Sequence, residues 1–466
     1  MTEHFDFVVI GSGPAGEKAA AKAAYFGKSV AIVERSPLPG GAAVSNAGIP
    51  TKTLRETALY LTGFRRRDVY GVRLELMPDA TVERLRCRTD EVIRTMTESV
   101  QRNIERHGIE LIHGHARLGP GRQVIVSNNG SDHVLRAERI LIATGSRPFH
   151  PPGIPFDDPD VYDSERIIKT DQPLRSTLVV GGGPVGCEYA SIFAALGVEV
   201  WLVDRAERLL PFADSEMSHL LAESFKGVGI HVVLNAGGAS IERDGQGLRA
   251  DLLNGGPIRP QQVLMAAGRV GNTEDLGLES VGVKVDERRR IVVDDEFRTT
   301  AEGIYAAGDV IGAPSLASVS MEQGRVAACY AFDIPFRDTL DPLAPFGVYS
   351  IPELAMVGLT EEAATAQNID YEVGRGWFSR NTRANIAGAT EGLVKLVFRR
   401  DSRELLGVHI LGDLAAELIP HGQSALHQGA TIEHFIHSTY NVPTLSEAYK
   451  YAAYDGLQRA EGKVIR

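Results

Sequence analysis

Two glycine-rich turns with the same spacing constrain the fold of this chain more than any other feature. The first reads Gly11-Ser12-Gly13-Pro14-Ala15-Gly16 and the second reads Gly181-Gly182-Gly183-Pro184-Val185-Gly186. Each follows a short apolar run and precedes helix-forming residues, and an acid, Glu34 or Asp204, stands 18 residues after its last glycine. A strand, a glycine turn, a helix and a second strand ending in an acid form a βαβ unit that binds a dinucleotide. The chain therefore predicts two such units.

The residues of these turns have separate physical roles. Gly11 permits the tight turn, Gly13 lets the backbone approach a pyrophosphate, and Gly16 lets the helix and strand pack closely. The helix N-terminus offers N–H groups and the positive end of its dipole to phosphates. Glu34 can accept hydrogen bonds from both ribose hydroxyls. The second unit has the same residue types at Gly181, Gly183, Gly186 and Asp204. We favour two working sites over one site and an inactive duplicate.

Hydrophobic patterning predicts the elements around the turns. In the first unit we expect a strand over 7–10, a helix over 17–26 and a strand over 29–33. In the second unit the corresponding elements are 178–180, 187–196 and 198–203. Three more apolar strands end in a glycine turn, and these turns contain Thr144 and Gly145, Gly268, and Gly308 and Asp309.

The chain changes character from about residue 345. Strand-like runs cover 346–351, 393–398 and 405–411, and helix-like stretches cover 415–427 and 446–458. No phosphate-binding loop occurs there. We expect an α+β domain in which helices pack on one face of a sheet.

Composition excludes several classes of protein. The 466 residues are 43% hydrophobic and 23% charged, so the chain is globular, and its net charge of −11 disfavours binding to nucleic acid or an anionic membrane. Cys87, Cys187 and Cys329 lie far apart without any zinc-site spacing, so we expect no metal site and no disulfide scaffold. No signal peptide and no apolar stretch of 18 residues is recognisable, which predicts a cytoplasmic protein.

The order of motifs resembles the FAD-containing pyridine nucleotide–disulfide oxidoreductases over the whole chain. After the first fingerprint come Gly40-Gly41, the segment 49–52 (IPTK), the segment 143–148 (ATGSRP) and the second fingerprint; then come 268–278, the pair Gly308-Asp309 and 443–447 (PTLSE). The resemblance implies two Rossmann-like domains of the glutathione reductase type and a C-terminal α+β dimerisation domain. The implied boundaries are 1–148 and 273–344 for the FAD domain, 149–272 for the NAD(P) domain and 345–466 for the dimerisation domain. It also implies a homodimer or a higher homo-oligomer.

The chain departs from the disulfide reductases at the residues that handle thiols. Ala43 and Gly48 stand where those enzymes carry the two redox cysteines, and Val442 stands where they carry the catalytic histidine. Disulfide exchange needs thiolates, so this chemistry is excluded at that place. His437 lies five residues before Val442, and we favour a polar interface role for it over a replacement base. Within the family, the sequence motifs elsewhere in the chain resemble those of the soluble pyridine nucleotide transhydrogenases.

The resemblance also implies the binding residues. Lys52 matches the family lysine beside the reactive flavin nitrogen, and Glu188 matches its ion-pair partner, so both are the expected catalytic residues. For FAD the implied residues are Gly11, Gly13, Pro14, Ala15, Gly16, Glu34, Arg35, Gly41, Lys52, Ala116, Thr144, Gly145, Gly308 and Asp309. For the nicotinamide coenzyme they are Gly181, Gly183, Pro184, Val185, Gly186, Asp204, Arg205 and Gly268.

The coenzyme preference stays open between NAD and NADP. Asp204 can pair with free ribose hydroxyls and repels a 2′-phosphate, whereas the adjacent Arg205 and the nearby Arg208 can grip one. Both together suit an enzyme that takes both coenzymes. Pro184 stands where the reductases carry a gating tyrosine, so a tyrosine-gated pocket is not expected.

The leading functional hypothesis is hydride transfer between NADPH and NAD through FAD, which needs neither a thiol nor a proton donor. The alternative is an NAD(P)H:acceptor oxidoreductase that reduces a quinone, a dye or O₂. A redox-sensing flavin-binding protein is a third hypothesis, and Lys52 and Glu188 argue against it. The arginine-rich segment 63–90 reads as a solvated helix face rather than an anion site.

Overall fold

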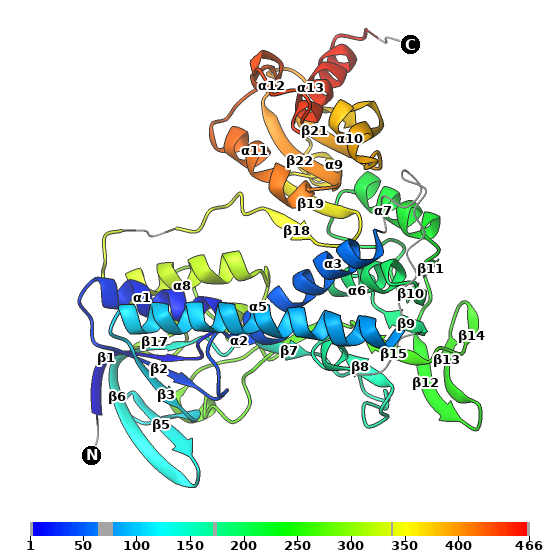
Figure 1. Cartoon of the computed structure of the whole chain (residues 1–466). Helices are drawn as coiled ribbons and strands as arrows, with labels where there is room; N and C mark the ends of the chain where they lie inside the picture. The colour runs from blue at the N-terminus through cyan, green and yellow to red at the C-terminus, as the bar shows by residue number, and fades with distance from the viewer. Residues whose placement is uncertain (1–2, 64–77, 171–174, 337–338, 464–466) are drawn as a thin grey trace. The chain divides into compact units, whose positions relative to one another are not determined.

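The computed structural model describes residues 3–63, 78–170, 175–336 and 339–463 (Figure 1). The chain forms two compact units that each contain several stretches of sequence. The first unit comprises residues 1–53, 86–149 and 268–342, and the second comprises 54–85, 150–267 and 343–466. Both predicted fingerprints lie in the described residues, one in each unit.

The first unit is built on a mainly parallel sheet. Its parallel strands are β1 (Glu3–Ile10), β2 (Val30–Glu34), β3 (Glu110–His113), β6 (Ser131–Ile142) and β17 (Ile304–Ala306). The order is β3-β2-β1-β6, and the long β6 pairs with β17 at its C-terminal end and with the antiparallel β5 (Gln123–Asn128) at its N-terminal end; β4 (His115–Gly119) follows β5. The carboxyl ends of β1, β6 and β17 therefore share one edge of the sheet.

Burial on both faces explains why β1 reads as a continuous apolar run. Phe7 and Val9 pack in the same cluster as the helices α1 (Pro14–Tyr25) and α8 (Ala317–Ala331), whereas Val8 and Ile10 pack on the opposite face with β4 and β5. A strand covered on both sides has no polar face to alternate with. The helices α1 and α8 lie side by side, as Figure 1 shows.

The second unit repeats the arrangement around a fully parallel sheet. Its order is β11-β10-β9-β15-β8, with bounds His231–Val233, Glu199–Val203, Ser176–Val180, Gln262–Met265 and Val161–Asp163. The helix α6 (Pro184–Ala195) connects β9 to β10, as α1 connects β1 to β2. The helix α7 is Ser215–Gly227, and a separate antiparallel sheet contains β12 (Ala239–Asp244), β13 (Gly247–Leu252) and β14 (Gly256–Ile258).

The C-terminal part of the second unit is an antiparallel sheet with helices. The strand order is β18-β19-β22-β21-β20, with bounds Phe346–Val348, Glu353–Gly358, Leu405–Gly412, Leu393–Arg399 and Tyr371–Trp377. The helix α11 (Ala415–His427) packs on β19 and β22, and α13 (Glu447–Ala460) packs on β20 and β21. The helices α9, α10 and α12 are Glu361–Ala366, Thr382–Ala387 and Glu433–His437.

Shorter elements complete the described residues. The helices α2 (Gly41–Ser45), α3 (Ile49–Thr62) and α5 (Pro78–Arg106) follow β2, and β7 (Ser146–Pro148) pairs with β16 (Arg269–Gly271). Four 3₁₀ turns cover Ile167–Lys169, Glu279–Val281, Asp309–Ile311 and Phe378–Arg380. None of the helices in these residues is long and apolar enough to cross a membrane.

The predicted fold class is confirmed, with corrections to the C-terminal elements. The predicted strand 346–351 ends at Val348, and the segment that follows makes side-chain contacts instead of a ladder. The strands β19 and β20 were not predicted. Gly374 and Gly376 weaken the strand pattern of β20 in the sequence. The structure explains both glycines, because α13 packs so closely there that a Cβ on either one would lie 2.1 Å from a helix carbonyl oxygen.

Candidate functional site

The first glycine turn needs its glycines for steric reasons that the structure shows directly. Gly11 has a φ of +103°, and a Cβ there would lie 2.5 Å from the carbonyl oxygen of Ala143. A Cβ on Gly16 would lie 1.9 Å from the carbonyl oxygen of Gly11. Both distances are too short for any side chain, so the turn between β1 and α1 requires glycine at both positions.

The second turn reproduces this geometry in the second unit. Gly181 has a φ of +118°, and a Cβ there would lie 2.3 Å from the carbonyl oxygen of Ala266. A Cβ on Gly186 would lie 1.7 Å from the carbonyl oxygen of Gly181. The glycines of the two turns therefore make equivalent close contacts, as the repeated sequence pattern predicts.

The two acids also have equivalent hydrogen bonds. Glu34 is buried at the end of β2 and accepts hydrogen bonds from the N–H groups of Ser12 at 2.9 Å and Ser36 at 2.7 Å. Asp204 follows β10 and accepts from the N–H groups of Gly182 and Ala206, the latter at 2.6 Å. Each carboxylate is thus fixed against the glycine turn, where a ribose beside the pyrophosphate would lie.

The helix N-termini at the turns carry no side-chain cap. Gly13 and Gly183 are the N-cap residues of α1 and α6, and neither helix has a side-chain hydrogen bond at its N-terminus. Pro14 and Pro184 occupy the first helical positions, where a missing N–H has no cost. By contrast, Asp214 caps α7 through its carboxylate. N–H groups at an uncapped helix end can bind the oxygens of a phosphate.

The backbone of the first turn is closely approached by the next loop. A Cβ on Gly41 would lie 2.8 Å from the Cα atom of Gly13, so the two backbones touch without side chains between them. Ser12 links them further, because its hydroxyl donates to Glu34 and accepts from the N–H of Gly40 at 3.1 Å. This arrangement is a cradle of backbone atoms of the kind that a pyrophosphate occupies.

The residues at the carboxyl ends of β6 and β17 form one hydrogen-bonded network. The Thr144 hydroxyl donates to the Asn272 carbonyl at 2.7 Å, and the Gly145 carbonyl accepts from the Asn272 N–H at 2.9 Å. Asp309 accepts from the Ser146 hydroxyl at 2.9 Å, and Gly308 adopts a φ of +81° beside it. Residues from three distant stretches of sequence thus meet at one edge of the sheet, and two of these stretches contain predicted site residues.

The remaining predicted residues of the first unit are Arg35, Ala116 and Lys52. Arg35 is exposed directly after Glu34, and Ala116 lies on β4 after a loop in which the Gly114 N–H bonds to the Glu34 carbonyl at 2.9 Å. Lys52 is partly buried in the first turn of α3, where its N–H bonds to the Gly48 carbonyl at 3.4 Å.

The two positions without cysteine touch each other. A Cβ on Gly48 would lie 2.8 Å from the carbonyl oxygen of Ala43. The backbone therefore has no room for a side chain at Gly48 without movement of the α2 backbone. The buried Cys187 does not replace a redox thiol: burial raises the pKa of its thiol, as do the nearby Glu188 and Asp204 carboxylates.

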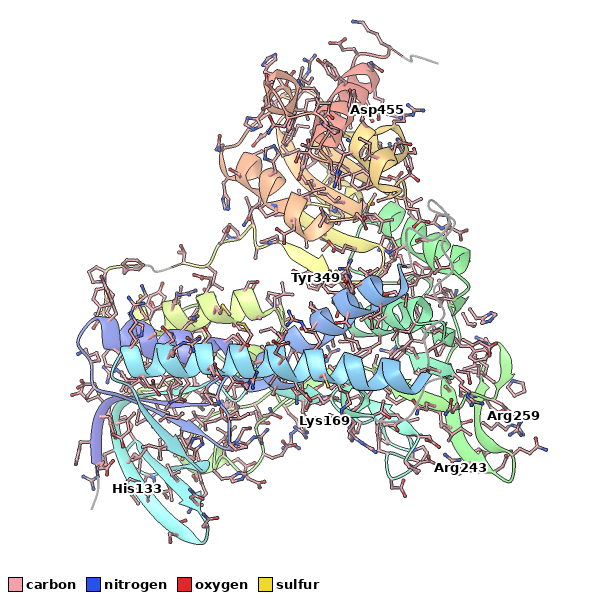
Figure 2. All side chains as sticks on the ribbon, in the orientation of Figure 1. His133, Lys169, Arg243, Arg259, Tyr349 and Asp455 are labelled. Carbon is pink, nitrogen blue, oxygen red and sulfur yellow. The ribbon has the colours of Figure 1, made fainter. Side chains whose placement is uncertain are left out.

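Glu188 is buried in α6 and is held by a segment of the C-terminal sheet. Its Oε1 atom accepts the Tyr349 N–H at 3.0 Å. The Ser191 hydroxyl donates to the Glu188 carbonyl at 2.9 Å and accepts the Ile351 N–H at 3.0 Å. Tyr349, labelled in Figure 2, belongs to the loop between β18 and β19. Sequence reasoning missed this loop because it bears no motif.

The two arginines after Asp204 differ in their contacts. The Arg208 guanidinium donates to the Pro211 carbonyl at 2.8 Å and pairs with Glu362 at 3.4 Å. Arg205 is exposed and makes no hydrogen bond or ion pair with any residue that the structure describes. Only Arg205 is therefore unengaged beside the acid. Val185 lies in the first turn of α6, and Gly268 has a φ of +102° after β15.

Other predicted positions lie apart from the glycine turns in sequence. Val442 is 69% exposed, and His437 is exposed at the end of α12. Arg65, Arg66 and Arg67 lie outside the described residues, whereas Arg88 is exposed and pairs with Glu91 at 2.8 Å.

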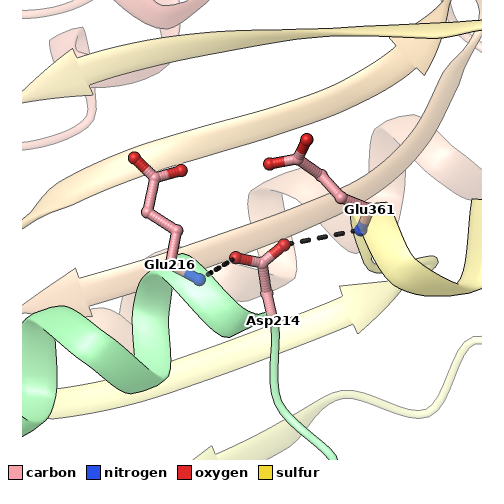
Figure 3. Close-up of side chains that lie close together, drawn as sticks. All are labelled: Asp214, Glu216 and Glu361. Atoms are coloured by element: carbon pink, nitrogen blue, oxygen red, sulfur yellow. Dashed lines mark hydrogen bonds between the residues drawn. The ribbon is translucent and has the colours of Figure 1, made fainter.

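One cluster of carboxylates has the spacing of a metal site. Asp214, Glu216 and Glu361 offer oxygens within 4.8 Å of one another (Figure 3). The fully buried ammonium group of Lys395 pairs with all three, at 2.8 Å from Asp214 and 2.9 Å from Glu216. Lys395 supplies the compensating positive charge, so the cluster is an ion-pair network between the β10–α7 region and the C-terminal sheet.

Comparisons with known proteins identify the family of this chain. The family model of the pyridine nucleotide-disulphide oxidoreductases matches residues 5–324, and the model of their dimerisation domain matches 344–453. A soluble pyridine nucleotide transhydrogenase of Mycobacterium tuberculosis is 40% identical over 457 residues, covering 98% of this chain and 97% of the relative. One from Photorhabdus laumondii is 41% identical over 460 residues, covering 98% and 99%.

Solved structures share the fold at lower identity. The Cu(II) complex of the HOCl-induced flavoprotein disulfide reductase RclA from Escherichia coli has a TM-score of 0.88 and 26% identity, covering 97% of this chain and 99% of that one. LpdA from Mycobacterium tuberculosis has a TM-score of 0.88 and 27% identity over the same shares.

Proposed function

Because this chain belongs to the pyridine nucleotide-disulphide oxidoreductase family, we propose that it is an FAD-dependent transhydrogenase that moves a hydride between NADPH and NAD. One observation carries the proposal. Both glycine turns have the geometry of a dinucleotide site, whereas Ala43 and Gly48 stand at the positions of the redox cysteines, so no thiol can relay electrons from one dinucleotide to a disulfide substrate. A chain without a thiol relay can still pass a hydride from one nicotinamide to another. The relative from Mycobacterium tuberculosis at 40% identity is named a soluble pyridine nucleotide transhydrogenase.

We assign FAD to the first unit. The Gly13–Gly41 contact and the uncapped N-terminus of α1 fit a pyrophosphate, and Glu34 fits a ribose. The assigned residues are Gly11, Gly13, Pro14, Ala15, Gly16, Glu34, Arg35, Gly41, Lys52, Ala116, Thr144, Gly145, Gly308 and Asp309. When bound, FAD supplies the centre that takes up and gives back a hydride.

We assign both nicotinamide coenzymes to one pocket at the second turn. Asp204 accepts hydrogen bonds from ribose hydroxyls, and the unengaged Arg205 contacts the 2′-phosphate of NADPH. NADPH binds first and leaves as NADP, and NAD then binds in the same pocket. The assigned residues are Gly181, Gly183, Pro184, Val185, Gly186, Asp204, Arg205 and Gly268.

Lys52 and Glu188 are the proposed catalytic residues. The Lys52 ammonium places a positive charge where negative charge grows during hydride transfer. The buried Glu188 carboxylate is itself fixed by the Tyr349 N–H, which donates to its Oε1 atom. Neither residue needs to move a proton, which agrees with Val442 at the family's histidine position.

The organisation of the chain follows from the same family. We propose that 1–148 and 273–344 hold FAD, that 149–272 holds NAD(P), and that 345–466 forms a homodimer interface. The dimerisation-domain match over 344–453 supports the last assignment. No disulfide joins the cysteines of the described residues, which suits a reducing compartment, and we place the protein in the cytoplasm.

A steady-state assay tests this function. The purified yellow protein is mixed with NADPH and a thionicotinamide analogue of NAD, whose reduced form absorbs at a separate wavelength. Formation of the reduced analogue, abolished in Lys52→Gln, is the expected result. Rapid NADPH oxidation that requires a quinone or O₂, with no reduced analogue formed, would instead identify an NAD(P)H:acceptor oxidoreductase.

A further inference from the structure

The loop between β18 and β19 is held from two sides by buried groups. On one side the N–H groups of Tyr349 and Ile351 bond to the Glu188 carboxylate and the Ser191 hydroxyl of α6, both at 3.0 Å. On the other side the loop contacts Arg55 of α3. The loop therefore links the Arg55 guanidinium to the Glu188 carboxylate.

Arg55 grips this loop at two points. Its Nε atom donates to the Ser350 carbonyl at 3.2 Å, and its Nη2 atom pairs with Glu353 at 2.9 Å. The side chains of Arg55 and Glu353 are only 6% and 7% exposed, so solvent screens this pair little. The planar guanidinium fork holds two acceptors in fixed directions, which an ammonium group cannot do.

Glu353 fixes the far end of the loop. Its second carboxylate oxygen accepts the N–H of Ala416 in the first turn of α11 at 3.1 Å. The Ser350 hydroxyl donates to the Pro352 carbonyl at 2.6 Å, and Ser350 is fully buried. The backbone between Tyr349 and Glu353 is thus immobilised by hydrogen bonds at almost every residue.

The charges of this network converge on the Tyr349 side chain. Burial raises the pKa of the Tyr349 phenol, and the Glu353, Glu417 and Glu188 carboxylates raise it further, while Arg55 lowers it. Arg55 is the nearby cation among groups that are otherwise acidic. Removing it would leave Glu353 buried without its charge partner and would release the Ser350 carbonyl.

We propose that Arg55 is a positioning residue for hydride transfer, which acts through the 349–353 loop on the Glu188 carboxylate. The proposal rests on the role given above to Glu188 and extends it to Arg55, which is not among the residues assigned to the cofactor or the coenzyme. Arg55 holds the Ser350 carbonyl and Glu353, these fix the loop backbone, and the Tyr349 N–H then fixes one oxygen of Glu188. Loss of the Arg55 contacts therefore displaces the Glu188 carboxylate.

A double-mutant cycle on the holoenzyme tests this route. Arg55→Lys keeps the charge but loses the fork, and Glu188→Gln removes the carboxylate; both are combined in one double variant. The readout is the rate constant of flavin bleaching by saturating NADPH in anaerobic stopped flow, at equal FAD content. We expect each single variant to be slower by about tenfold to a hundredfold, and the double variant to be no slower than Glu188→Gln.

Two further variants separate positioning from general loss of stability. Arg55→Met with Glu353→Gln removes both buried charges, and it should fold yet bleach as slowly as Arg55→Lys. Arg375→Gln breaks a comparable pair with Glu216, whose two bonds are 2.7 and 2.9 Å. It should lower the thermal midpoint while keeping the wild-type bleaching rate within twofold.

The outcomes distinguish this proposal from the proposed function. The positioning role is overturned if the double variant is slowed by the product of the two single-variant factors. It is also overturned if Arg55→Lys bleaches the flavin at the wild-type rate. Either result leaves transhydrogenation intact. Wild-type bleaching in Glu188→Gln beside a slow Arg55→Lys overturns the route through Glu188. If NADPH bleaches the flavin of the wild-type protein but NAD is not reduced, the proposed function is wrong. The double-mutant cycle still tests the role of Arg55, because it measures only flavin reduction by NADPH.

Discussion

At the scale of single residues, Arg205 and Arg208 offer a clean test of coenzyme recognition. Arg205 has no partner among the described residues, whereas Arg208 is held by Glu362 and the Pro211 carbonyl. We predict that Arg205→Gln lowers kcat/KM for NADPH by about tenfold, which corresponds to about 1.4 kcal/mol, and leaves kcat/KM for NADH unchanged. Initial rates of flavin reduction with each coenzyme measure the ratio.

Arg208→Gln is the matched control for that prediction. It removes the same charge three residues further along the chain, but the Arg208 guanidinium already has two protein acceptors. It should change thermal stability and leave the NADPH-to-NADH ratio as in the wild type. A ratio that falls equally in both variants would show that charge in this loop acts at long range rather than through Arg205.

The close contact at Gly48 gives a second prediction at this scale. A methyl group there would lie 2.8 Å from the Ala43 carbonyl oxygen, so the α2 and α3 backbones must separate. We expect Gly48→Ala to lower the free energy of unfolding by about 1–3 kcal/mol and to slow flavin reduction, since Lys52 lies one turn further along α3. Urea unfolding and stopped flow measure the two effects.

Gly245→Ala serves as the comparison for Gly48→Ala. Gly245 is exposed, and a Cβ there would have no atom within 4 Å. Its unfolding free energy and reduction rate should match the wild type. Equal loss of stability in both variants would mean that the Ala43 contact adds no strain.

At the scale of elements, the packing of α1 on α8 determines where the first helix N-terminus lies. A Cβ on Gly324 would lie 2.1 Å from the Ala15 carbonyl oxygen, and the neighbouring Gln323 side chain accepts the Gly308 N–H at 2.9 Å. Gly324→Ala must push α8 away from α1 and from the residues that we assign to FAD. We predict purified protein with less than half of the wild-type FAD content, measured by absorbance at 450 nm relative to 280 nm.

Gly227→Ala controls for the cost of any glycine substitution in a helix. A Cβ on Gly227 of α7 meets no atom within 4 Å, so this variant should keep full FAD content. Full FAD content in Gly324→Ala as well would contradict the proposed placement of the cofactor at α1.

The elements also show what the sequence could predict and what it could not. The βαβ units were predictable because Gly11, Gly16 and Glu34 act within about 25 contiguous residues, and the same holds for Gly181, Gly186 and Asp204. The strand β20 was not, because Gly374 and Gly376 are explained only by α13, about 75 residues later. The contact of Arg55 with Glu353 joins residues almost 300 positions apart and has no local pattern.

At the scale of the whole molecule, the Lys395 cluster joins the β10–α7 region to the C-terminal sheet. Burial alone would lower the pKa of Lys395, but the Asp214, Glu361 and Glu216 carboxylates raise it above its usual value. Burial alone would raise the pKa of Glu216, but Arg375 and Lys395 lower it. The lysine thus stays charged at neutral pH, and Glu216 contributes stability above its ordinary pKa that is lost as the pH falls.

We predict that Lys395→Met destabilises the protein by about 3–5 kcal/mol at pH 7, because three carboxylates then lose their common partner. The loss should shrink toward pH 4.5, because the stability that the lowered pKa of Glu216 gives the wild type is lost as the pH falls. Urea unfolding at both pH values measures it. A loss of the same size at both would contradict the cluster's role as a compensated set of charges.

The central claim is that one chain without a redox thiol passes a hydride from NADPH to NAD through one coenzyme pocket. The most direct measurement is a two-step anaerobic stopped-flow experiment on the purified holoenzyme. NADPH is added first to bleach the flavin, and NAD is then mixed in while flavin absorbance and NADH are recorded. The account predicts that the flavin colour returns with one NADH formed per flavin; colour that returns only after a quinone or O₂ is added would contradict it.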